Sequence, residues 1–340
     1  VTLQIVVILT TENFYFYLLT AAFVELFQKF FVSWYLNRRY PYLKDKNVVK
    51  LSSEETGEIV RKTKALLFHK IGDVARLQTD SMIISGFINV TLVGYVGNYN
   101  LILTSVSNFV NIIFNSVLSS FGNLIATESK DKQYQVFKVY RFFACWIYGF
   151  SAVGFFLLLT PLIILWPSVG PEKTLPVAVI ACILTDYYFK GDRIVLSNFK
   201  TAAGVFEQDK YLALIQGGVN LVISIVLVQK IGLIGVYIGT IISGLIANVT
   251  KPYIIYKACF GRDVKTYFVD SVKYLAVILG ILALLLGIKH VIMQEVTVIN
   301  FAVMFVMISV AFNGIFLLLF GRTEEFGYLW GIVRKKLGRR

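Results

Sequence analysis

The chain has 340 residues, of which 57% are hydrophobic and 16% charged, and its formal net charge is +13. Its mean hydropathy is +0.71, whereas about a quarter of the residues in an ordinary soluble domain are charged, so a water-soluble fold is excluded. Apolar runs of about 20 residues recur along the whole length, each long enough to cross a hydrocarbon core about 30 Å thick as a helix. Runs such as residues 276–288 do not alternate apolar and polar positions, so the expected spanning element is a helix and not a barrel strand.

The positive charge lies mostly in short connections between apolar runs, so membrane topology explains it better than nucleic-acid binding, and no nucleic-acid partner is expected. Cys145, Cys182 and Cys259 are widely spaced in or beside apolar runs, which predicts neither a disulfide framework nor a zinc site. With only His69 and His290 present, a histidine-based metal site lacks ligands. No metal or other cofactor is therefore expected.

The chain opens on Val1 in an apolar run without an initiator methionine, a basic leader or a signal-peptide cleavage site. It reads as the tail of a helix already under way, so we expect the natural protein to contain residues upstream. The first complete span is predicted over residues 13–35, ended by polar residues and Pro41.

A polar loop is predicted over residues 38–64, in which Ser52 or Ser53 caps a short helix with Glu55 or Glu58 in its first turns. About nine or ten spans are expected in all. The further spans are predicted at 65–89, 98–122, 142–165, 174–204, 211–229, 231–256, 268–289 and 297–320.

Lysine and arginine are distributed unequally between the two ends of these spans. One side holds 26 of them and the other only three, so the basic side, with the tail 321–340, is predicted to be cytoplasmic. Residues 127–141 on that side read equally well as an amphipathic piece at the membrane interface or as a solvated loop.

Charged residues inside the spans are more informative, because an ionisable side chain near the bilayer centre costs about 2.5 to 3.5 kcal/mol on insertion scales. Asp73, Arg76 and Asp80 are spaced by three and four and share one helical stripe. Two interpretations remain open: a structural ion pair within the helix, or the lining of a polar translocation path.

A second charged segment is TDYYFKGDRIVLSNFK, which contains Lys190, Asp192 and Arg193, all three candidates with Asp80 for the lining of a substrate cavity. Lys190 and Arg193 are three residues apart and could present two positive charges to one side, which suits the oxygens of a phosphate group. Gly191 predicts a local break or a close helix approach. The alternative is two shorter elements with the charges in an interfacial turn.

Asn108, Asn111 and Asn115 repeat at helical spacing in the span 98–122, accompanied by several serines. Such a stripe either bonds to neighbouring helices or lines a wet cavity. Small residues serve close packing in GLIGVYIGTIISG, where Gly232, Gly235 and Gly239 are expected to let helices approach.

The segment GVFEQDKYLALIQGGVNLVISIVLVQKIGLIGVYIGTIIS, residues 204–243, resembles the bacterial polysaccharide flippases, the Wzx-type oligosaccharide-lipid translocases. It contains counterparts of the family's Gln-Asp-Lys/Arg-Tyr turn, Asn-Leu-rich helix, Gly-hydrophobic-Gly link and Gly-Thr-Ile-Ile-Ser helix. Upstream, Asp80 stands at a typical polar position of the family, and Arg193 matches its Gly-x-Arg step. Asp73 and Arg76 depart from the family, which commonly has small or aliphatic residues there.

This resemblance covers essentially the whole chain and implies an all-α polytopic, MATE-like helical bundle of the multidrug/oligosaccharidyl-lipid/polysaccharide exporter superfamily. It places the end of an N-terminal lobe at 1–37 and a cytoplasmic link at 38–64. A C-terminal lobe of six spans follows at 65–256, and two additional spans at 257–320.

The resemblance further implies a non-enzymatic translocase that flips undecaprenyl-pyrophosphate-linked oligosaccharide for surface polysaccharide such as O-antigen, capsule or exopolysaccharide. Lys190 and Arg193 would hold the phosphate, and Asp80 with the asparagines would contact sugar hydroxyls or a coupled H⁺ or Na⁺. Membrane lipids, a polysaccharide polymerase and chain-length proteins are the other expected partners. Rival readings are a cation-coupled multidrug exporter, which a net-cationic cavity disfavours, a membrane glycosyltransferase or polymerase, and a structural scaffold.

Overall fold

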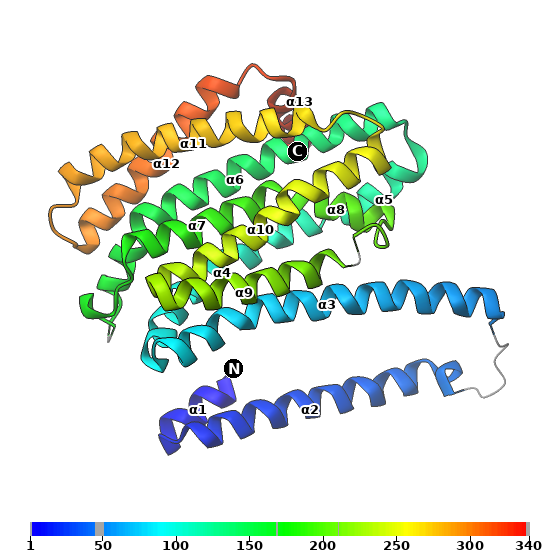
Figure 1. The fold of residues 1–340 in the computed structure, drawn as a ribbon, viewed down its shortest axis with the longest axis horizontal. Coiled ribbons are helices and arrows are strands. Elements are labelled where there is room, and N and C mark those ends of the chain that lie inside the picture. Colours follow the sequence, from blue (N-terminus) through cyan, green and yellow to red (C-terminus); the bar gives the residue numbers. More distant parts are fainter. Residues whose placement is uncertain (1, 45–50, 168, 210, 338–340) are drawn as a thin grey trace. The chain divides into compact units, whose positions relative to one another are not determined.

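The computed structural model of the chain describes residues 2–44, 51–167, 169–209 and 211–337 (Figure 1). Within these ranges it describes all side chains except those of residues 43, 44, 65, 66, 68–78, 333 and 335–337. The chain divides into two compact units, Val1–Ile59 and Val60–Arg340. All regular elements in the described ranges are helices.

The first unit contains α1 (Thr2–Thr11), α2 (Phe14–Arg39), a 3₁₀ turn (Pro41–Lys44) and the beginning of α3 (Ser53–Phe87). Asn13 caps α2, because its Oδ1 accepts a hydrogen bond from the Tyr15 backbone N–H at 2.9 Å. None of the side chains of α2 is buried within the chain, as expected for an apolar helix that faces lipid or other helices.

The N-terminus of α3 is closed by a reciprocal pair of hydrogen bonds between Ser52 and Glu55. The Glu55 backbone N–H donates to Ser52 Oγ at 3.2 Å, while the Ser52 backbone N–H donates to Glu55 Oε2 at 2.9 Å. The predicted cap is therefore confirmed. The helix that it starts is not short, however: it continues without interruption to Phe87, so the predicted loop helix and the next predicted span are one element.

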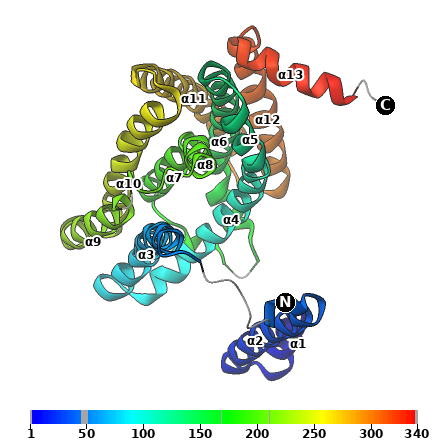
Figure 2. The same ribbon diagram turned by 90° about the vertical axis from the view of Figure 1, so that its right-hand side faces the viewer.

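In the second unit the chain continues from α3 through ten further α-helices (Figures 1 and 2). Their bounds are α4 (Val90–Asn115), α5 (Leu118–Thr127), α6 (Lys130–Leu165), α7 (Val177–Asp192), α8 (Ile194–Ala203), α9 (Leu212–Ile231), α10 (Leu233–Ile255), α11 (Lys265–Ile292), α12 (Val298–Phe320) and α13 (Glu324–Leu337). A 3₁₀ turn (Pro171–Lys173) precedes α7, and a π-helical turn (Tyr256–Phe260) extends α10.

Seven helices in the described part of the chain are long and apolar enough to cross a membrane: α2, α4 with α5, α6, α9, α10 with its π-helical turn, α11 and α12. The expectation of an all-α polytopic membrane protein is thus confirmed. The other predicted spans correspond to α3, which carries many charged residues, and to α7 and α8, which have 16 and 10 residues and are separately short for a span.

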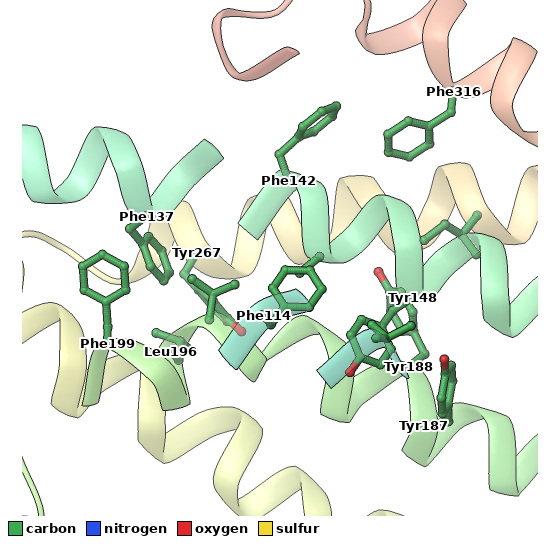
Figure 3. Packing of buried hydrophobic residues seen from close by; sticks show 14 of the residues in the cluster. Phe114, Phe137, Phe142, Tyr148, Tyr187, Tyr188, Leu196, Phe199, Tyr267 and Phe316 are labelled. Atoms are coloured by element: carbon green, nitrogen blue, oxygen red, sulfur yellow. The ribbon is translucent and has the colours of Figure 1, made fainter. Parts of the chain in front are cut away.

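Residues 127–141 differ from both interpretations of the sequence. They form neither a separate interfacial piece nor a loop, because residues 130 onward belong to α6, with Ser129 as its N-cap. Phe137 is fully buried and packs against Phe199 and Phe260, with ring centroids 5.5 and 5.0 Å apart (Figure 3). The apolar side of the amphipathic interpretation therefore exists, but it packs inside the bundle and not on the membrane interface.

The α7 and α8 helices lie at the centre of the second unit, among α4, α5, α6 and α10 (Figure 2). The packing of α9 on α10 uses two of the expected glycines. A Cβ on Gly235 would overlap the Leu227 backbone, and one on Gly239 would overlap the Ser224 side chain. Gly232 acts differently: its φ of 63° makes the turn between the two helices, and no atom lies within 4 Å of the position of a Cβ.

Candidate functional site

The break between α7 and α8 falls on Arg193, which has φ −97° and ψ 1°. Next to it, a Cβ on Gly191 would overlap the ring of Tyr148 in α6, so the predicted break and the predicted close approach both occur. The interpretation of two shorter elements is therefore correct. The Arg193 side chain does not lie in an exposed turn, because Arg193 is only 6% exposed.

Arg193 joins the break to α10. Its Nη1 donates to the Gly244 carbonyl oxygen at 3.3 Å and to Asn248 Oδ1. These acceptors are four residues apart on one face of α10. Two oxygen atoms of a neighbouring helix therefore accept hydrogen bonds from Nη1 of this buried guanidinium.

Asp80 of α3 reaches the same face of α10. Its two carboxylate oxygens lie 3.1 and 2.9 Å from the hydroxyl of Thr240. That hydroxyl also accepts a hydrogen bond from Asn220 Nδ2 of α9 at 3.0 Å. The result is a polar chain across α3, α10 and α9.

Thr240, Gly244 and Asn248 follow one another at intervals of four, and we call them the α10 stripe. At 1.5 Å per residue, the contact with Asp80 and the two contacts with Arg193 lie within about 12 Å along α10. The structure therefore gathers an anionic and a cationic side chain from separate helices on one polar face.

Lys190 does not join Arg193 in a pair of like charges. Its Nζ lies 2.6 Å from Asp186 Oδ2, one turn earlier in α7, and 45% of the Lys190 side chain is exposed. Because this ion pair offsets the lysine charge, the main cation at the α10 stripe is Arg193.

Asp192 faces another part of the bundle. Its Oδ2 accepts hydrogen bonds from the hydroxyls of Tyr267 and Ser271 in α11, at 3.0 and 2.8 Å, and its Oδ1 lies 3.4 Å from Arg141 Nη2 in α6. The structure thus separates Asp192 from Asp80, although both were expected to line one cavity.

The sequence placed Arg141 outside the spans, in an interfacial amphipathic piece or a solvated loop, but it is only 3% exposed. Its Cζ lies 3.7 Å from the centroid of the Tyr267 ring, and its Nη2 donates to the Tyr267 carbonyl at 2.8 Å. The signal that could have revealed it is helical periodicity, since Phe137, Arg141 and Tyr148 lie near one face of α6 and all are buried.

The asparagine stripe of α4 is only partly engaged. Asn111 Oδ1 accepts a hydrogen bond from the Tyr148 hydroxyl at 3.0 Å, while Asn108 and Asn115 are exposed. The stripe therefore bonds α4 to α6 at one position and leaves two amides on the surface of the chain. The side chains of Asp73 and Arg76 lie outside the described residues.

The fold and these contacts define a multi-pass helical membrane protein with a charged polar site between its helices. Neither a protein-family model nor a curated protein matches the chain. Among solved structures it is similar to a lipid II flippase, MurJ, in an inward closed conformation, with 19% sequence identity and a TM-score of 0.48. The match covers 76% of this chain and 53% of the other, so this chain spans about half the length of that flippase.

Proposed function

We propose that the chain belongs to a flippase that moves a polyprenyl-pyrophosphate-linked oligosaccharide from the cytoplasmic to the outer leaflet for surface polysaccharide synthesis. The observation that carries this proposal is the meeting of Asp80 and Arg193, from separate helices, on the α10 stripe. A sugar and a pyrophosphate cannot cross hydrocarbon unaided, so polar groups must replace their hydration.

In this proposal Arg193 takes up phosphate oxygens through the fork of its guanidinium. The Gly244 and Asn248 oxygens hold that guanidinium in the absence of cargo, and phosphate replaces them when cargo binds. Asp80 and the exposed amides of Asn108 and Asn115 contact sugar hydroxyls, or Asp80 carries a coupled H⁺ or Na⁺.

The domain organisation belongs to the same proposal. Residues 65–256 form the C-terminal lobe, residues 1–37 the end of an N-terminal lobe, and the helices of 257–320 an addition to the second lobe. The basic ends of the helices face the cytoplasm. Alternating access to the α10 stripe then exposes the cargo to one leaflet at a time.

Complementation tests the proposal. The natural protein that contains this chain is expressed in a matched host without its own flippase, and surface polysaccharide and lipid-linked sugar on the inner leaflet are measured. Arg193→Ala is compared with Arg193→Lys, which keeps the charge, and with Lys230→Ala at an exposed helix end. Membrane levels of each variant are measured in parallel.

We expect Arg193→Ala to lose surface polysaccharide and to accumulate lipid-linked sugar at normal protein levels, Arg193→Lys to retain part of the activity, and Lys230→Ala to match the wild type. Full rescue by Arg193→Ala would remove this residue from the mechanism. Failure of the wild type in its own polysaccharide system would direct attention to drug export or to an enzyme of the same pathways.

A further inference from the structure

The last helix, α13, is amphipathic and follows the apolar α12 after a short turn. Its inner side packs on α6: Phe326 lies 6.1 Å from Trp146 between ring centroids, and Glu325 Oε1 accepts from Lys138 Nζ at 3.0 Å. Leu329 also packs against the core. Figure 2 shows α13 extending sideways from the end of α12, across the direction of the other helices.

The flanks of α13 expose apolar and aromatic side chains. Tyr328 is 43% exposed, Trp330 58% and Ile332 40%. A helix of 14 residues is about 21 Å long and cannot span a hydrocarbon core of about 30 Å. Tyrosine and tryptophan beside the end of a spanning helix are typical of the membrane interface, where their rings meet both lipid and water.

The charge around these rings is positive. Arg322 and Arg334 are exposed, and Lys132 Nζ lies 5.7 Å from the centroid of the Tyr328 ring. Residues 321–340 contain six lysines and arginines against two glutamates, and one of these, Glu325, is paired with Lys138. The exposed flanks of α13 therefore combine apolar rings with excess positive charge.

We propose that α13 is an interfacial helix that binds the headgroups of anionic phospholipids. Its apolar flanks enter the boundary between headgroups and acyl chains, while the neighbouring basic side chains attract the lipid phosphates. This binding site is separate from the α10 stripe and independent of the proposed transport.

The test uses the full chain in nanodiscs that contain phosphatidylcholine and an increasing fraction of brominated phosphatidylglycerol. The fluorescence of Trp330 is obtained as the difference between the wild type and Trp330→Phe. The same titration with brominated phosphatidylcholine is the control, because it measures lipid contact that does not depend on headgroup charge. Arg334→Gln serves as the charge variant, and Lys230→Gln as the control at the opposite end of the bundle.

We expect Trp330 to be quenched at a lower fraction of brominated phosphatidylglycerol than of brominated phosphatidylcholine. Arg334→Gln should raise the half-quenching fraction about fivefold, the loss given by one basic contact at an anionic surface, and Lys230→Gln should leave it unchanged. Equal quenching by the two lipids, or none by either, would overturn the proposal, the latter pointing to a water-facing surface for a protein partner.

Discussion

Arg141 and Asp192 are far apart in the sequence and form a nearly water-free ion pair between α6 and the end of α7. Their side chains are 3% and 9% exposed. Tyr267 and Ser271 of α11 complete the hydrogen bonding of the carboxylate, whereas the buried Nε of Arg141 has no hydrogen-bond partner among the described residues. Burial of two charges is tolerated only with such partners, and removal of one partner leaves an uncompensated charge.

Asp192→Asn is therefore expected to lower the free energy of unfolding by about 3 kcal/mol, the lower end of the range for a broken buried pair, because Arg141 keeps only the more distant and more exposed Asp270 as a counter-ion, 3.8 Å from Nη1. The measurement is a thermal unfolding curve of the purified chain in detergent. Asp131→Asn is the matched control, since Asp131 pairs with Arg262 at 2.6 Å while 79% of the Asp131 side chain is exposed. Equal losses in the two variants would show that burial does not set the cost.

For single residues, the sequence was enough to predict that charged side chains lie within the spans, but not which groups they contact. Asp80 and Arg193 stood out because they interrupt apolar runs. The acceptors of Arg193 are 51 and 55 residues away, and one is a backbone carbonyl that no residue type marks. Asp192 and Arg193 are neighbours in the sequence, and nothing in it indicates that their side chains contact different helices. In the structure Arg193 contacts α10, whereas Asp192 contacts α11 and α6.

At the scale of single elements, the cap of α3 makes the stability of its first helical turn depend on pH. Glu55 accepts hydrogen bonds from the Ser52 backbone N–H and from its hydroxyl, which lower the pKa of the Glu55 carboxyl. Because the folded pKa is the lower one, the ionised carboxylate stabilises the turn above the ordinary glutamate pKa of about 4.3. That contribution is lost as the pH falls through the lowered value.

Ser52→Ala is expected to raise the pKa of Glu55 part of the way back to its ordinary value, because the hydroxyl donor is lost while the backbone donor remains. Carboxyl ¹³C chemical shifts of Glu55, followed from neutral to acidic pH in wild type and variant, measure the change. An unchanged titration midpoint would contradict the hydroxyl contact.

The approach of α7 to α6 depends on Gly191, where a Cβ would overlap the Tyr148 ring. Gly191→Ala should cost about 1 to 3 kcal/mol of unfolding free energy by overpacking. Gly218→Ala in α9 is the control, since no atom lies within 4 Å of its Cβ position and alanine favours the helix. The thermal unfolding midpoints of both variants are compared with wild type, and a loss as large in Gly218→Ala as in Gly191→Ala would refute the packing argument.

Apolar run length predicted the spans of α2, α9, α10, α11 and α12 closely, because a bilayer imposes a minimum length on each of them. Helix ends that lie outside hydrocarbon were less predictable. The polar start of α3 continues as helix from its Ser52 cap, and the charged start of α6 from its Ser129 cap with Phe137 buried behind it. Both helices therefore extend beyond the apolar runs from which the spans were predicted.

At the scale of the whole molecule, the last spanning helices are part of the core. Tyr267, Ile281, Phe312 and Phe316 of α11 and α12 are at most 3% exposed and belong to the same cluster as Phe142 of α6 (Figure 3). The family resemblance predicted α11 and α12 as two additional spans, which describes where they come in the chain. Their packing is different, because both helices contact α6 and α11 also bonds to Arg141.

Truncation after Gly261 is therefore expected to prevent stable accumulation of the chain in the membrane. It removes α11 and α12, uncovers the aromatic face of α6 and takes away the Tyr267 and Ser271 groups that bind Arg141 and Asp192. Truncation after Arg322 is the matched control, because it removes only α13 and keeps those contacts. Western blots of membranes and size-exclusion profiles in mild detergent measure the outcome. A monodisperse, stable chain ending at Gly261 would show that α11 and α12 pack on the bundle without supporting it, whereas loss of the chain ending at Arg322 would assign to α13 a folding role that its exposed flanks do not predict.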